Sequence, residues 1–192
     1  MKVAFCGVGA LGSSAAVLCR NLELDGRLLV DFDKVESKNL LAQAFVKQSL
    51  GKNKAEALKL QLLNFWGVRA EAAPVRVVAE NVDAVLAGYD LVVDAFDNRA
   101  GRAVLSVHAR RAGTALVHAA VSADGTFGLV RWDERFVPDA EDVAGQATCE
   151  GGEHLPFFGL LSATLARAVQ DYARKREKWD AMVSLSGVSV AR

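Results

Sequence analysis

The sequence predicts an α/β fold: a doubly wound, Rossmann-like, mostly parallel sheet with helices on both faces and an antiparallel extension in its C-terminal part. An apolar run at Lys2–Cys6 leads into a glycine-rich loop and then a helix of small residues at 13–22. Strand-like and helical segments then alternate along the chain. Two later strands, expected at 115–121 and 126–132, are joined by a short turn, so the sheet stops growing in parallel there.

The remaining elements follow in chain order. A strand is expected at 27–30, and an amphipathic helix at 52–66 ends before Gly67. A strand near 72–78 contains Pro74, which favours a sheet edge or a strand start. We also expect strands at 91–95 and 182–190 and helices at 99–112 and 156–178. The apolar stripe of the helix at 52–66 consists of Ala55, Leu58, Leu62, Leu63 and Trp66.

Length and charge narrow the functional classes. The 192 residues suit one domain spanning 1–192, with a mobile loop at about 133–154, where acidic residues, glycines and a proline replace apolar periodicity. Lys plus Arg and Asp plus Glu both number 23, so the chain lacks the positive field that binding to nucleic acid needs. No apolar segment reaches the roughly 20 residues of a membrane span, and no secretory signal precedes the first strand. We therefore expect a cytoplasmic protein that binds neither nucleic acid nor membrane.

The first loop predicts a nucleotide site. Gly7, Gly9 and Gly12 allow a tight turn, close approach of a phosphate and packing of the helix on the sheet. Leu11 lies in the same turn and is counted with the nucleotide-binding residues. Asp31 ends the second strand, where a carboxylate can accept both ribose hydroxyls. These features fit a nicotinamide dehydrogenase equally well, and glycines serving packing alone are the simpler alternative.

A more specific signal follows the second strand. It consists of DFDKVESKNL at 31–40, Gln43, GKNKA at 51–55 and DAFDN at 94–98. This ordered series resembles the ThiF/MoeB/HesA/E1-like superfamily, the ATP-dependent adenylating enzymes of ubiquitin-like and sulfur-carrier proteins. The resemblance runs from Val3 to about Ala168. The ordered set, rather than any single motif, makes the resemblance specific.

The resemblance implies ATP and Mg²⁺ as cofactors, with a role for each matched residue. Asp31 matches the ribose ligand, and Asp33 completes the Asp-x-Asp turn beside it. Asn39 and Gln43 match a polar pair that lies along the phosphates. Lys54 matches the phosphate lysine, which counters charge on the leaving pyrophosphate. A solvated surface lysine is the simpler interpretation of Lys54.

The segment at 94–98 matches the metal-binding part of the family. Asp97 matches the magnesium carboxylate, a hard oxygen ligand, and Asn98 is counted with it among the cofactor-binding residues. A helix N-cap is the simpler role for Asp97. Arg102 matches a family arginine, although a salt bridge on the helix surface explains it equally well.

The three cysteines have different expected roles. Their odd number and wide spacing fit neither a disulfide framework nor a Cys-x-x-Cys site, so no structural zinc is expected. Cys6 and Cys19 are expected to be small buried side chains. Cys149 matches the cysteine before the family's final helix, where an exposed thiol could capture an acyl-adenylate. Nearby glutamates would lower its thiolate fraction, and His154 is its one candidate partner.

Two cationic groups of the family pattern are missing. The family's Asn-Leu-x-Arg-Gln is Asn-Leu-Leu-Ala-Gln at 39–43, so Ala42 replaces an arginine. Losing one such transition-state donor typically costs about 3 kcal/mol. The chain also starts at the first strand, without the arm whose arginine reaches a partner's site. Lys38, Lys47 or Lys52 could substitute, but an arginine donated by another protein is the preferred explanation.

The predicted function is ATP-dependent adenylation of the C-terminal carboxylate of a ubiquitin-like or sulfur-carrier protein. Lys54, Asp97 and Cys149 are the expected catalytic residues, and a homodimer or a heteromeric E1-like pair is the expected assembly. The first alternative is a degenerate, non-catalytic E1-like adaptor that pairs with an active partner. The second is an NAD-dependent oxidoreductase, which explains the glycines and Asp31 but leaves 51–54 and Asp97 without a role.

Overall fold

The computed structural model describes residues 1–122, 124–137 and 154–191, and its centre is one eight-stranded sheet. The strand order is β3-β2-β1-β4-β5-β6-β7-β8. Neighbouring strands run parallel from β3 to β5 and antiparallel from β5 to β8. The strands are β1 (Lys2–Cys6), β2 (Gly26–Val30), β3 (Glu71–Ala73), β4 (Leu91–Asp94), β5 (Ala115–Val121), β6 (Phe127–Trp132), β7 (Asp180–Ser184) and β8 (Gly187–Ala191). The predicted fold class is confirmed.

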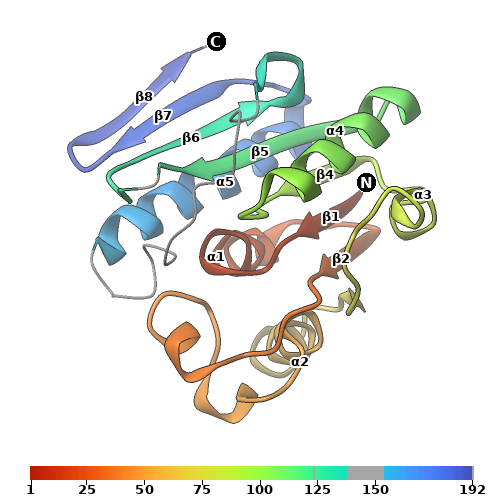
Figure 1. Cartoon of the computed structure of the whole chain (residues 1–192), viewed down its shortest axis with the longest axis vertical. Coiled ribbons are helices and arrows are strands. Elements are labelled where there is room, and N and C mark those ends of the chain that lie inside the picture. The colour runs from red at the N-terminus through yellow and green to blue at the C-terminus, as the bar shows by residue number, and fades with distance from the viewer. Residues whose placement is uncertain (123, 138–153, 192) are drawn as a thin grey trace.

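Helices cover both faces of the sheet (Figure 1). They are α1 (Ala10–Leu18), α2 (Lys54–Trp66), α3 (Val82–Val85), α4 (Arg99–Ala112) and α5 (Leu155–Lys175). Alternate residues of a strand point to opposite faces, so Phe5 belongs to the core under α1, α2 and α5, whereas Ala4 belongs to the core under α3 and α4. This winding brings the carboxyl ends of β1, β2 and β4 to one edge, beside the start of α1.

Several elements differ from their predicted bounds. The helix expected at 13–22 begins at Ala10, and the helix expected at 52–66 begins at Lys54 because the Asn53 side chain caps it. The strand expected at 72–78 is reduced to β3, an edge strand that ends directly before Pro74. The single strand expected at 182–190 is a hairpin of β7 and β8.

The apolar stripe of α2 is wider than its buried face. Leu58 and Leu62 are fully buried, but Leu63 and Trp66 are 45% and 41% exposed. The reason is the position of the helix at the sheet edge, where it packs on β2 and the short β3. The predicted amphipathic helix is confirmed, but Leu63 and Trp66 of its apolar stripe lie outside the core.

The cysteines inside the described ranges are buried. Cys6 and Cys19 are fully inaccessible, as predicted. Burial raises the pKa of Cys19 to about 12, which makes it a poor nucleophile. Cys149 lies outside the described residues, as do 138–153 of the expected mobile loop. The first residues of that predicted loop form a 3₁₀ turn, η4 (Asp133–Arg135), in which Asp133 is buried.

Within residues 1–122, 124–137 and 154–191, no helix is long and apolar enough to cross a bilayer. Those residues also contain no group of three or more His, Cys, Asp or Glu side chains that could hold a metal ion.

Candidate nucleotide site

The glycine loop between β1 and α1 combines tight packing with open space. A Cβ on Gly7 would lie 2.7 Å from the Ala95 carbonyl oxygen, and one on Gly12 would lie 1.8 Å from the Gly7 carbonyl oxygen. Both glycines are therefore required for packing, and Gly7 also has a φ of +83°. A Cβ on Gly9 would meet nothing within 4 Å. Packing thus explains Gly7 and Gly12 but not Gly9, which borders open space.

The start of α1 offers backbone donors at this open space. Gly9 is the N-cap residue, and it has no side chain with which to satisfy the first amides of the helix. The first-turn amides, including that of Leu11, lack acceptors within the helix, and the helix dipole adds positive potential there. The Ser13 hydroxyl donates to the Gly9 carbonyl at 2.6 Å and accepts from the Ala44 amide at 3.0 Å. Ser13 therefore connects the glycine loop to the segment that contains Gln43.

Asp31 fixes the loop that follows β2. Its carboxylate is 6% exposed and accepts the amides of Val8 and Asp33, both at 2.9 Å. Burial raises the pKa of Asp31, although hydrogen bonds from these amides and the nearby charge of Lys54 oppose the shift. A carboxylate has about four acceptor positions, so two bonds leave capacity for ligand hydroxyls.

Lys54 lies at the start of α2 and is 8% exposed. Its Nζ is 3.3 Å from Asp33 Oδ2, and its backbone amide donates to the Asp33 carbonyl at 2.8 Å. Asn53 reinforces this junction by donating to the Asp31 carbonyl at 2.9 Å and accepting from the Glu56 amide at 3.1 Å. Lys54 is thus a buried, positioned cation rather than a solvated surface lysine.

Asp97 is an exposed carboxylate in the loop that leaves β4. The N-cap of α4 is Asn98, whose Oδ1 accepts the Gly101 amide at 2.8 Å, so Asp97 is not the cap. Residue Ala95 of the same loop touches Gly7, which brings the loop against the glycine turn. Magnesium is often bound by one or two carboxylates together with phosphates and water. A lone carboxylate at this position therefore fits that ion.

The predicted phosphate pair, Asn39 and Gln43, is only partly available. Asn39 is 5% exposed, and its Oδ1 accepts the Glu36 amide at 2.8 Å as part of a capping box. One acceptor position of the Asn39 oxygen is thus occupied, and its side-chain NH₂ is left for a ligand. Gln43 Oε1 is buried and finds no hydrogen-bond partner within the described ranges.

Sequence reasoning missed a buried polar cluster behind this site. Asp94 and His118 come from β4 and β5, and Asp133 begins η4. The His118 ring nitrogens lie 2.7 Å from Asp94 Oδ2 and 3.1 Å from Asp133 Oδ1. Arg102 also pairs with the fully buried Asp94, at 3.3 Å, so it does not form a surface salt bridge. A histidine within the apolar run at 115–121 was the available signal.

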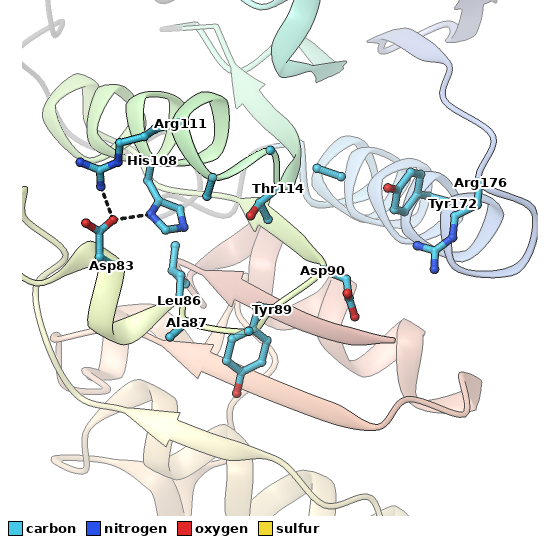
Figure 2. A pocket seen from close by; sticks show the side chains of 14 residues that line it. Asp83, Leu86, Ala87, Tyr89, Asp90, His108, Arg111, Thr114, Tyr172 and Arg176 are labelled. Carbon is cyan, nitrogen blue, oxygen red and sulfur yellow. Dashed lines mark hydrogen bonds and ion pairs between the residues drawn. The ribbon is translucent and has the colours of Figure 1, made fainter.

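A pocket of about 800 Å³ lies at the opposite end of the sheet (Figure 2). It is lined by residues that precede β4 and β5 and by the ends of α4 and α5. Asp83 there contacts both His108 and Arg111 (Figure 2). Helix C-termini carry negative dipole ends, which disfavour phosphate. The open N-terminus of α1 is therefore the better candidate for a nucleotide site.

The parallel sheet, the glycine turn and the carboxylate after β2 define a Rossmann-like α/β domain. Comparison with known families specifies the class further. The model of the ThiF family matches residues 1–144, and the chain belongs to this family.

Curated relatives are named as adenylyltransferases or as an activating enzyme. The chain is 28% identical over 176 residues to the adenylyltransferase and sulfurtransferase UBA4 of Lodderomyces elongisporus, covering 86% of this chain and 38% of that protein. It is 41% identical over 96 residues to the sulfur carrier protein adenylyltransferase of Thermus thermophilus, covering 48% of this chain and 35% of that protein. It is 37% identical over 123 residues to the SAMP-activating enzyme E1 of Haloferax volcanii, covering 62% of this chain and 45% of that protein. The chain thus spans less than half the length of each.

Solved structures support the fold. Escherichia coli MccB crystallised with ATP superposes with a TM-score of 0.77 at 17% identity, covering 98% of this chain and 62% of that one. The structure of PaaA superposes with a TM-score of 0.74 at 16% identity, covering 98% of this chain and 62% of that one.

Proposed function

We propose that this chain binds ATP with magnesium and adenylates the C-terminal carboxylate of a ubiquitin-like or sulfur-carrier protein. The observation that best supports this proposal is the open N-terminus of α1 at Gly9, next to the buried Lys54 and the loop of Asp97. Relatives named as adenylyltransferases, one of them of a sulfur carrier protein, favour the same chemistry.

The reaction would depend mainly on positioning. An oxygen of the carrier's carboxylate attacks the α-phosphorus of ATP, the bond to the bridging oxygen breaks, and pyrophosphate leaves as the acyl-adenylate forms. First-turn amides of α1 and Lys54 would bind the phosphates, and Asp31 would accept the ribose hydroxyls. Asp97 would hold magnesium, which supplies charge neutralisation to the leaving group.

The missing arginine leaves one cation unaccounted for. Ala42 stands at its position, and Lys38, Lys47 and Lys52 are all exposed, with Lys38 Nζ 3.3 Å from Glu36. We propose that a second subunit, either another copy or an E1-like partner, donates an arginine. Capture of the acyl group by Cys149 is a further proposal about a residue outside the described ranges.

The test is ATP–pyrophosphate exchange that requires a carrier protein ending in two glycines. Exchange with one such carrier, alone or together with a partner subunit, is the expected result. If the chain binds Mg-ATP by calorimetry but supports no exchange with any candidate carrier or partner, the non-catalytic adaptor is the better description. If the chain binds NADH in a fluorescence titration instead of ATP, the oxidoreductase alternative replaces both.

A further inference from the structure

The cluster behind the site connects two segments that are distant in sequence. Asp94 and His118 are paired across β4 and β5, and both are fully buried. His118 Nδ1 lies 2.7 Å from Asp94 Oδ2, and His118 Nε2 lies 3.1 Å from Asp133 Oδ1. His118 therefore bridges the end of β4 and the start of η4 through its two ring nitrogens.

The Asp94 end of the cluster holds the loop that leads to Asp97. Asp94 Oδ1 accepts the Phe96 amide at 3.0 Å, and Arg102 pairs with Asp94 Oδ2 at 3.3 Å. The same guanidinium donates to the Phe96 carbonyl and, at 3.0 Å, to the Ala119 carbonyl. Hydrogen bonds thus fix both the amide and the carbonyl group of Phe96. This restricts the positions that the carboxylate of the next residue, Asp97, can adopt.

The Asp133 end of the cluster holds the chain as it leaves β6. Arg110 Nε donates to Asp133 Oδ2 at 2.6 Å, and the Phe136 ring stacks on the His118 ring at 3.9 Å with 14° between planes. Burial tends to raise the pKa of Asp133, but hydrogen bonds from Arg110 and His118 hold it below its ordinary value. Asp133 therefore stays ionised and remains an acceptor for the imidazole.

We propose that His118 is a positioning residue, which holds the loop of Asp97 through Asp94 and the segment Asp133–Phe136 through its other nitrogen. The inference rests on the proposed function, because it assigns to Asp97 a geometry suited to a nucleotide-bound metal. A buried histidine that only stabilised the core would not affect the magnesium dependence of nucleotide binding.

Two substitutions separate the two ends of the imidazole. Asn places its NH₂ near the position of Nδ1 and Gln near that of Nε2, so His118→Asn keeps the bond to Asp94 and His118→Gln keeps the bond to Asp133. The control is His108→Gln, because His108 is also buried and its Nδ1 also lies 2.7 Å from an aspartate, Asp83. Arg110→Ala removes the ion pair between Arg110 and Asp133. Because the Arg110 side chain is exposed, this substitution leaves the core intact.

The measurements are calorimetric ATP affinity with and without magnesium, and deuterium uptake of the intact protein over 94–102 and 131–136. We expect His118→Gln to reduce the magnesium-dependent gain in affinity at least tenfold and to raise uptake over 94–102. We expect His118→Asn to keep that gain within about threefold, and both His118→Asn and Arg110→Ala to raise uptake over 131–136. His108→Gln should change neither quantity.

Two results would overturn the inference. The first is a magnesium-dependent gain in folded His118→Gln equal to that of the wild type. The second is uptake over 94–102 that rises equally in His118→Asn and His118→Gln. If the wild type binds no ATP at all, the proposed function fails, and the two uptake patterns alone then decide whether His118 holds the two segments.

Discussion

Gly9 gives the sharpest test of where the phosphates bind. Its Cβ would enter open space, and its φ of −77° is accessible to alanine, but its ψ of −145° lies outside the main allowed regions of an L-residue, which costs roughly 1 kcal/mol. Alanine is a poorer N-cap than glycine by roughly 0.5–1 kcal/mol. It also restricts the unfolded chain, which stabilises the fold by about 0.4–1 kcal/mol. These effects partly cancel, so Gly9→Ala should lower the free energy of unfolding by about 1–2 kcal/mol and leave the protein folded.

The same methyl group would occupy the space beside the first-turn amides of α1. A hydrogen bond to a charged group is worth about 1.5–3 kcal/mol, so losing one reduces ATP affinity about tenfold to a hundredfold. Urea unfolding and calorimetry with Mg-ATP measure the two quantities separately. Gly159→Ala is the matched control, because Gly159 lies within α5, also faces open space, and should gain about 0.5–1 kcal/mol in stability with unchanged affinity.

Gly12→Ala should behave in the opposite way. Its Cβ would lie 1.8 Å from the Gly7 carbonyl oxygen, so α1 must move by more than an ångström, and overpacking of this kind costs about 1–3 kcal/mol or more. A folded Gly9→Ala protein with wild-type affinity for Mg-ATP would refute the placement of the ATP phosphates at the first-turn amides of α1. A Gly12→Ala protein of wild-type stability would refute the close approach of Gly12 to the Gly7 carbonyl oxygen.

Three further predictions concern charged side chains. Lys54→Met should lower ATP affinity at least tenfold, whereas Lys59→Met on the exposed side of the same helix should not; equal calorimetric affinities would contradict this. Asp97→Asn should keep stability within about 0.5 kcal/mol, because the residue is exposed, but should abolish the gain in ATP affinity that magnesium provides; a retained gain would exclude Asp97 as the ligand. Hydrogen bonds from Ser122 and Thr126 lower the pKa of Asp124 to about 2, so the stability from this turn is present above pH 3.8 and lost as the pH falls through about 2. In acid titrations of thermal stability, Asp124→Asn should lose less stability than the wild type over that range, and identical curves would refute this.

The parallel half of the fold could be predicted because each strand there is a continuous apolar run. Strands buried on both faces need such runs, and the turn at Gly7 and the capped helix starts have local chemical signals. The C-terminal hairpin was harder to predict, because β8 is largely exposed and Met182 of β7 is 48% exposed. Neither strand therefore has a clear pattern of burial.

The site could be predicted as a set of residues but not as a set of contacts. Spacing indicated that Asp31, Lys54 and Asp97 follow strands or begin helices near one edge. It could not show that the Asn39 oxygen is used by a capping box, or that Asp94 and His118 are paired across two strands. Those facts depend on register and tertiary packing, which connect residues far apart in the sequence.

The side-chain contacts of Asp31, Lys54 and Asp97 show which of these residues best distinguishes an active enzyme from an inactive adaptor. Asp31 binds two backbone amides, and Lys54 joins the loop after β2 to α2, so both have structural roles that an adaptor would keep. Asp97 differs, because within the described part of the chain its carboxylate has a 3.4 Å hydrogen bond from the neighbouring Asn98 and is otherwise exposed. Packing gives little reason for a carboxylate there. Asp97, rather than Asp31 or Lys54, is therefore the residue whose presence argues for retained nucleotide chemistry despite Ala42.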